Sequence, residues 1–133
     1  LVHERLLLVF KKANETFNGA MLDEYLSDEV KYTSQRIWDD MQGKDKIAQY
    51  LIDRYKFFEE KKEESRRTFE RGYVDGSFVN QPCLVLSINE KKEGYISINV
   101  NKDEKISSID NITSFPPVET VKIVEQFTFE KLN

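Results

Sequence analysis

The chain has 133 residues, the size of one domain with a single hydrophobic core. It carries 20 lysine and arginine residues against 24 aspartate and glutamate residues, and the two kinds alternate along the chain without forming a basic patch. This mixture argues against nucleic acid or an anionic membrane surface as a partner. From its length we expect a single domain over residues 1–133.

Apolar runs and cysteines set further limits. The longest apolar run, residues 6–10, is far shorter than the roughly 20 residues that cross a bilayer, and no signal peptide pattern is present, so we expect a cytoplasmic protein. Cys83 is the only cysteine, which excludes a disulfide within the chain, and we expect a buried thiol. With a single histidine, His3, there is no Cys/His cluster for zinc, and we expect neither a metal nor a cofactor.

The first half of the chain is predicted to be mainly helical. Residues 2–17 place apolar side chains at a three-to-four spacing, which indicates a helix. A short helix is predicted over residues 21–26, and the alternation of residues 30–34 is typical of a strand. A long helix is predicted from about residue 44 to 64, because an apolar stripe with one polar member runs along it: Ile47, Tyr50, Leu51, Arg54, Tyr55 and Phe58.

From Arg67 onward the period of the pattern changes to two. Strands are predicted over residues 67–75, 82–89, 94–101 and 105–112, and the short polar connections between them suit antiparallel neighbours. Helices followed by a meander of strands indicate an α+β domain, with the helices on one face of a curved antiparallel sheet.

The order of these elements resembles a known superfamily. The resemblance rests on a short helix ending in "YLSDEVKY", a strand, "GKDKIAQYL" at the start of the long helix and "KISSIDNI" in the last strand. On these segments the chain resembles the nuclear transport factor 2-like superfamily, which includes ketosteroid isomerase, scytalone dehydratase and SnoaL-like polyketide cyclases. The likeness covers about residues 2–112. It implies a cone-shaped curved antiparallel sheet wrapped around the long helix, two N-terminal helices, a pocket at the open end and pairing of subunits through the sheet. Residues 113–133 would add a strand or an arm.

The resemblance to ketosteroid isomerase implies a carboxylate base late on the first strand. That position falls on Ser34 or Thr33, depending on the end from which the strand is counted, and neither side chain can act as a base. Tyr32 could hold an oxyanion by residue type, but this role needs a base beside it. Scytalone dehydratase-like proteins use pocket histidines, and here His3 stands at the chain end. We therefore expect no isomerisation of a 3-oxo-Δ5-steroid.

Aliphatic alternation predicts the floor of the pocket. Leu84, Leu86 and Ile88 share one face of their strand, and Ile96, Ile98 and Val100 share one face of the next. This aliphatic side is expected to face the long helix, which leaves no inward carboxylate on these two strands. Late in the sheet, Asp110 is the one candidate carboxylate, with an ambiguous facing. The predicted ligand-binding residues are Tyr32, Ser34, Trp38, Leu84, Leu86 and Ile98.

Two interpretations remain open for the adjacent carboxylates Asp39 and Asp40. They could end the strand and bond turn amides just before the long helix, where negative charge is favourable. Alternatively, one of them could enter the pocket beside Trp38 and Tyr32, where desolvation would raise its pKa toward that of a general base. Neighbours on an extended strand point to opposite sides, so at most one can enter.

These interpretations lead to different functions. The first is a non-catalytic module that binds a small molecule or a protein and has an apolar pocket. The alternative is a SnoaL-like isomerase, cyclase or hydrolase acting on a small apolar substrate with Asp39 or Asp40 and Tyr32. A third reading is a self-associating structural protein with a filled cavity.

The outward positions of the same strands predict a homodimer. In a chain that is 33% charged, none of them is charged, and depletion of charge is typical of the centre of a protein–protein interface. A two-fold pair would make the contact self-complementary. The positions are Cys83, Val85, Ser87, Tyr95, Ser97 and Asn99.

Overall fold

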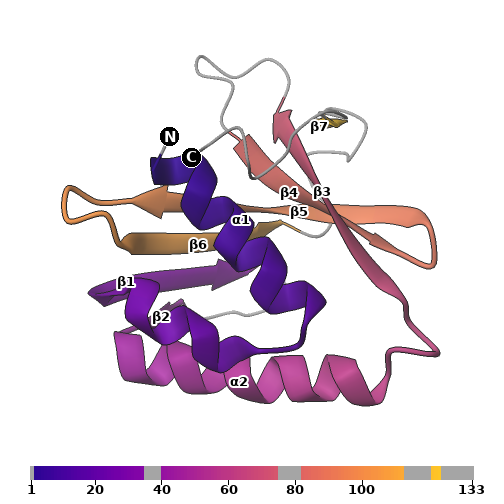
Figure 1. Ribbon diagram of the computed structural model, residues 1–133, viewed down its shortest axis with the longest axis horizontal. Helices are drawn as coiled ribbons and strands as arrows, with labels where there is room; N and C mark the ends of the chain where they lie inside the picture. Colours follow the sequence, from indigo (N-terminus) through magenta and orange to yellow (C-terminus); the bar gives the residue numbers. More distant parts are fainter. Residues whose placement is uncertain (1, 35–39, 75–81, 113–120, 124–133) are drawn as a thin grey trace.

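The computed structural model describes residues 2–34, 40–74, 82–112 and 121–123. These residues form an α+β structure with the helices α1 (Val2–Glu15) and α2 (Lys44–Glu60), the 3₁₀ helix η1 (Gly19–Tyr25) and one sheet. In Figure 1 the helix α1 lies across the sheet, and α2 runs along the side of the sheet where β1 and β2 lie. The predicted fold class, α+β with helices against a curved sheet, is confirmed.

The sheet has seven strands in the order β2-β1-β6-β5-β4-β3-β7. Neighbouring strands are antiparallel except β1 and β6, which are parallel, so the prediction of a purely antiparallel sheet is wrong at this pair. A parallel pair needs a long connection, which α2 and the intervening strands provide here. The strands are β1 (Leu26–Ser34), β2 (Met41–Gln42), β3 (Arg67–Val74), β4 (Pro82–Ile88), β5 (Lys91–Val100), β6 (Ile106–Ile112) and β7 (Val121–Ile123).

Most elements lie where the sequence patterns predict them, but several bounds differ. The predicted helix over residues 21–26 is a 3₁₀ helix that ends at Tyr25, and β1 begins at Leu26, before the predicted start at residue 30. The prediction that the long helix reaches residue 64 is wrong, because α2 ends at Glu60 and turns follow. Residues 61–64 are all charged and exposed, so this stretch has no apolar face whose burial would stabilise another helical turn. Strand β5 begins at Lys91, before the predicted start at residue 94.

Two β-bulges set which residues face inward. In the pairing of β4 with β5, Leu86 lies opposite Gly94 and Ser87 opposite Lys92, so Glu93 is an extra residue. In the pairing of β5 with β6, Asn99 lies opposite Ser108 and Val100 opposite Ile106, so Ser107 is extra. This second bulge explains why Ile106 and Ile109, three residues apart, are both fully buried.

The core lies between the inner face of the sheet and the helices. Its fully buried side chains come from α1, η1, α2 and the sheet, and Gly19 allows η1 to approach α2 closely. A Cβ atom on Gly19 would lie 2.8 Å from both the Cα and the backbone nitrogen of Ile52, so this contact admits glycine alone. None of the helices described is long and apolar enough to cross a membrane. The largest fully buried side chains of this core are Leu7, Phe10, Leu22, Leu26, Val30, Ile47, Leu84, Ile98, Ile106 and Ile109.

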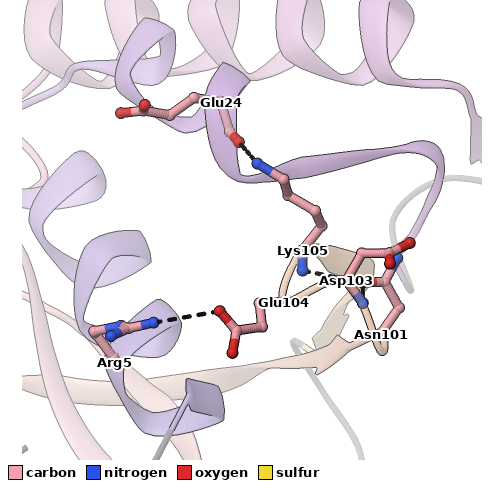
Figure 2. Close-up of polar contacts among 6 residues, drawn as sticks. All are labelled: Arg5, Glu24, Asn101, Asp103, Glu104 and Lys105. Carbon is pink, nitrogen blue, oxygen red and sulfur yellow. Dashed lines mark hydrogen bonds and ion pairs between the residues drawn. The ribbon is translucent and has the colours of Figure 1, made fainter.

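The turn between β5 and β6 is joined to both N-terminal helices (Figure 2). The side-chain oxygen of Asn101 accepts hydrogen bonds from two backbone amides of the turn, one of them from Lys105 at 3.0 Å. The Nζ atom of Lys105 donates to the backbone oxygen of Glu24 in η1 at 2.5 Å. Arg5 of α1 lies 4.0 Å from the carboxylate of Glu104. We call this region, residues 101–105 with their partners on α1 and η1, the turn end of the molecule.

Candidate functional site

A cavity of about 100 Å³ lies between the C-terminal half of α2, α1 and the inner face of the sheet. Its floor is aliphatic because alternate residues of β4, β5 and β6 point toward the helices. The floor residues are Leu86, Ile88, Ile96 and Ile109. This part of the cavity agrees with the aliphatic inner face that the alternation predicts.

One face of α2 forms a wall of the cavity. Tyr50, Arg54 and Phe58 follow one another at intervals of four residues, which places them on the same side of the helix. The rings of Tyr50 and Tyr32 have their centroids 5.2 Å apart. Arg54 is the polar member of the apolar stripe seen in the sequence, and its guanidinium carbon lies 4.7 Å from the centroid of the Phe58 ring.

Arg67, the first residue of β3, supplies a second guanidinium to the cavity. Its guanidinium carbon lies 3.5 Å from the centroid of Phe58 and 5.0 Å from that of Phe69. Burial lowers the pKa of Arg67 to about 10, so the side chain still carries its charge at neutral pH. Its Nη1 atom is buried and has no hydrogen-bond partner among the described residues.

Tyrosine hydroxyls and amide groups complete the polar lining. Burial raises the pKa of Tyr32 to about 12, which keeps the phenol protonated at neutral pH. The Nδ2 atom of Asn111 donates to the Tyr32 hydroxyl at 3.2 Å, whereas the buried Oδ1 atom of Asn111 has no partner among the described residues. On the α1 side, the Nδ2 atom of Asn14 donates to the Tyr55 hydroxyl and to the backbone oxygen of Phe10, both at 2.9 Å.

Glu93 brings one carboxylate to the lining of the cavity. The expectation that β4 and β5 offer no inward carboxylate is therefore wrong. The reason is the bulge at Glu93, which interrupts the alternation just before Gly94, where the strand was predicted to start. No ion pair between Glu93 and either arginine of the cavity is found in the part of the chain that the structure describes.

The predicted ligand-binding residues divide into three groups. Tyr32, Ser34 and Leu86 line the cavity. Leu84 and Ile98 are fully buried in the core and do not line it. Trp38 lies outside the described residues.

The candidate catalytic carboxylates are not brought to the cavity by the described residues. Asp40 is exposed and does not line the cavity, while Asp39 lies outside the described residues. Asp110 is on the other face of the sheet, where its Oδ1 atom accepts a hydrogen bond from the Thr33 hydroxyl at 2.5 Å. His3 does not reach the cavity either, because its Nε2 atom lies 2.8 Å from the backbone oxygen of Ile98.

The outer face of the sheet holds a second, small apolar cluster. Cys83, Val85 and Tyr95 form it, with exposed fractions of 0%, 1% and 9% within a single chain. Burial raises the pKa of the Cys83 thiol to about 12, which makes it a poor nucleophile. Ser87 and Ser97 are half-buried, and Asn99 is exposed. The homodimer through this face stays a prediction, and light scattering of the wild-type protein would test it.

No group of three or more His, Cys, Asp or Glu side chains that could hold a metal ion occurs within residues 2–34, 40–74, 82–112 and 121–123. In the part of the chain that the structure describes, the charged residues that line the cavity are Arg54, Arg67 and Glu93.

Solved structures that are similar to this chain share its fold. An uncharacterised protein with a cystatin-like fold from Silicibacter pomeroyi DSS-3 has a TM-score of 0.63 at 16% identity, over 89% of this chain and 77% of that chain. A steroid delta-isomerase from Pseudomonas aeruginosa has a TM-score of 0.60 at 12% identity, over 98% and 85%. A nuclear transport factor 2-like protein of unknown function from Exiguobacterium sp. 255-15 has a TM-score of 0.52 at 14% identity, over 85% and 98%.

The chain has the nuclear transport factor 2-like cone fold. The resemblance noted in the sequence is thereby confirmed at the level of fold. No protein-family model matches the chain, and no curated protein matches it. Proteins with the cone fold include an enzyme as well as proteins of unknown function, so the fold alone does not determine an activity.

Proposed function

We propose that this protein binds a small molecule in the cavity between α2 and the sheet and does not alter it chemically. The observation that carries the proposal is the combination of an aliphatic floor with two buried polar atoms, Arg67 Nη1 and Asn111 Oδ1, that have no partner among the described residues. Buried polar groups in proteins are normally paired, and a ligand with an acceptor and a donor would pair both. Small-molecule sites typically combine an apolar lining with a few convergent polar groups.

The residue at the expected base position supports binding without catalysis. Ser34 lines the cavity, whereas Thr33 bonds Asp110 on the other face, so Ser34 takes the inward place. A serine hydroxyl is far too weak a base to abstract a proton from carbon by itself. The Tyr32 phenol is protonated and can donate a hydrogen bond, which serves binding equally well.

One observation favours the alternative, an isomerase, cyclase or hydrolase of the SnoaL-like kind acting on a small apolar substrate. Glu93 lines the same cavity as Tyr32, so residues that could supply a base and a hydrogen-bond donor are both present. This pair takes the place of the Asp39 or Asp40 carboxylate considered from the sequence. In this reading Glu93 would remove a proton and Tyr32 would stabilise the developing negative charge.

Native mass spectrometry of freshly purified protein tests the binding proposal. We expect the wild type to retain a small molecule, and Ile88→Trp to lose it because the indole would fill the cavity from its rim. Val100→Trp is the matched control, since Val100 is a half-buried aliphatic residue of the same sheet that does not line the cavity. Retention of the same mass by Ile88→Trp would contradict the proposal.

The catalytic alternative has its own test. We expect no isomerisation of a 3-oxo-Δ5-steroid above the buffer rate, because Ser34 replaces the base. Turnover that disappears in Glu93→Gln and persists in Glu90→Gln would establish the enzyme instead. Glu90 is a suitable control because its side chain is 80% exposed and pairs with Arg66 at the surface.

A further inference from the structure

Three arginines close together in sequence have different electrostatic partners. Arg66 pairs with Glu90 at 2.8 Å, and Arg71 of β3 forms a bidentate pair with Glu4 of α1. Arg67, between them, has aromatic rings as neighbours, and no described carboxylate lies within ion-pair distance of it. A guanidinium removed from water without a counter-ion costs free energy, so an anion that reached Arg67 would be strongly stabilised.

The packing around Arg67 leaves its hydrogen-bond donors available. The centroid of the Phe58 ring lies 3.5 Å from the guanidinium carbon, a distance at which the ring covers a face of the planar group. The N–H groups point outward in the plane of a guanidinium, and the Nη1 atom of Arg67 is buried without a partner among the described residues. The side chain is therefore held by stacking while its donors can bind an acceptor.

The charge and size of the cavity limit the acceptor. Among the described residues, Arg54, Arg67 and Glu93 are the charged ones that line it, and together they carry one net positive charge, which suits a singly charged anion. A volume of about 100 Å³ is smaller than the roughly 150 Å³ cavity that holds benzene, so the enclosed part of a ligand has only a few carbon atoms. A carboxylate matches the flat, forked donors of arginine, and a short alkyl chain matches the aliphatic floor.

We infer that the ligand is a small carboxylate, whose carboxylate group binds the Arg67 guanidinium and whose alkyl part lies on the floor of β4, β5 and β6. This inference rests on the proposed small-molecule function and specifies the chemical class of its ligand. It assigns Arg67 as the residue that determines specificity for an anion over a neutral molecule of equal shape.

Isothermal titration calorimetry with butyrate and butyramide, which differ in charge but little in shape, tests the inference. We expect butyrate to bind the wild type at least about tenfold more tightly than butyramide, as is typical when a hydrogen bond to a charged group is lost. Arg67→Met should lose this preference. The matched control is Arg66→Met, whose side chain is 60% exposed and does not line the cavity, and it should keep the wild-type preference.

Several outcomes would overturn the inference. Equal affinity of the wild type for both probes, with both blocked by Ile88→Trp, would leave the small-molecule function standing and remove the carboxylate. Absence of binding by either probe while native mass spectrometry still detects a retained neutral compound would do the same. Displacement of butyrate by inorganic phosphate at lower concentration would assign a different anion. If circular dichroism shows that Arg67→Met does not fold, the comparison of the two probes on the wild type and on Arg67→Lys decides, because lysine keeps the charge.

Discussion

The turn end and the cavity differ in whether their polar side chains have hydrogen-bond or ion-pair partners. At the turn end, Asn101, Lys105 and Glu104 all have partners, and these contacts join the sheet to α1 and η1 (Figure 2). In the cavity, Arg67 and Asn111 each keep a buried polar atom unpaired among the described residues. Polar groups at the turn end therefore stabilise the fold, whereas Arg67 and Asn111 in the cavity each hold a polar atom at a cost in stability, which is a feature typical of binding sites.

The largest difference in stability is expected between shortening an isoleucine to alanine in the core and shortening one beside the cavity. Ile98 is fully buried in the core, on the strand that leads into the turn, so Ile98→Ala should lower the free energy of unfolding by about 2–5 kcal/mol. Ile88 is half-buried beside the cavity, and Ile88→Ala should cost less than about 1 kcal/mol because fewer contacts are lost. Urea unfolding of both variants measures the difference. Equal losses would mean that the cavity is packed as tightly as the core.

The next effect compares two asparagines. Asn14 is 2% exposed and its amide joins Phe10 to Tyr55, so Asn14→Ala should lower the free energy of unfolding by about 2 kcal/mol and leave the Tyr55 hydroxyl buried without that donor. Asn101→Ala also removes two hydrogen bonds, but at an exposed turn where water replaces them, and should cost about 1 kcal/mol or less. Thermal unfolding of the two variants side by side gives the ranking. The reverse ranking would contradict the assigned burial.

Removing the charge of Arg67 in the cavity and that of Lys105 at the turn end should change the free energy of unfolding in opposite directions. Arg67→Met should raise the free energy of unfolding by about 1 kcal/mol, because it removes a desolvated charge at the expense of stacking on Phe58. Lys105→Met should lower it by about 0.5 kcal/mol through loss of the bond to the Glu24 backbone. Denaturant titration at neutral pH measures both. Destabilisation by Arg67→Met would mean that the cation is stabilised within the free protein.

The smallest expected effect is a pH dependence that comes from Tyr32. Its pKa of about 12 in the folded protein lies above the ordinary 10.0, so the stabilisation it contributes is complete below pH 10 and is lost as the pH rises toward 12. Between about pH 9 and 10 the wild type should lose about 0.4 kcal/mol more than Tyr32→Phe. The difference between the two proteins is the quantity to measure, because the lowered pKa of Arg67 acts in the opposite direction in both. Parallel losses in the two proteins would exclude Tyr32 as the source.

Local patterns predicted the elements of the fold but not all of its pairings. Helices, strands and the aliphatic floor follow from periods of 3.6 and 2 that single segments carry. The parallel pairing of β1 with β6 joins residues such as Tyr32 and Ile109, which are far apart in the chain, and no local pattern specifies it. The bulge at Glu93 was not predicted either, because it depends on how β4 and β5 align and not on the sequence of either strand alone.

The polar half of the candidate site was missed for a related reason. Arg67 follows a run of charged residues that ends in Arg66, and composition alone does not separate the two arginines. One signal was present: Arg67 and Phe69 are two residues apart on a predicted strand, so they share a face, and Phe69 belongs inside. Tyr32, Ser34 and Leu86, which were predicted to bind a ligand, line the cavity, whereas Ile98 is in the core because the cavity occupies only part of the inner face.

The stacking of Arg67 on Phe58 has a consequence for the entropy of binding. A free arginine side chain samples many rotamers, and fixing it costs about 2 kcal/mol. In this protein the ring of Phe58, together with that of Phe69 two residues along β3, restricts the guanidinium before any ligand arrives. The Arg67 side chain is therefore already ordered when the proposed ligand binds. Less of the free energy of the ligand contacts is then lost in fixing that side chain, and the affinity is higher.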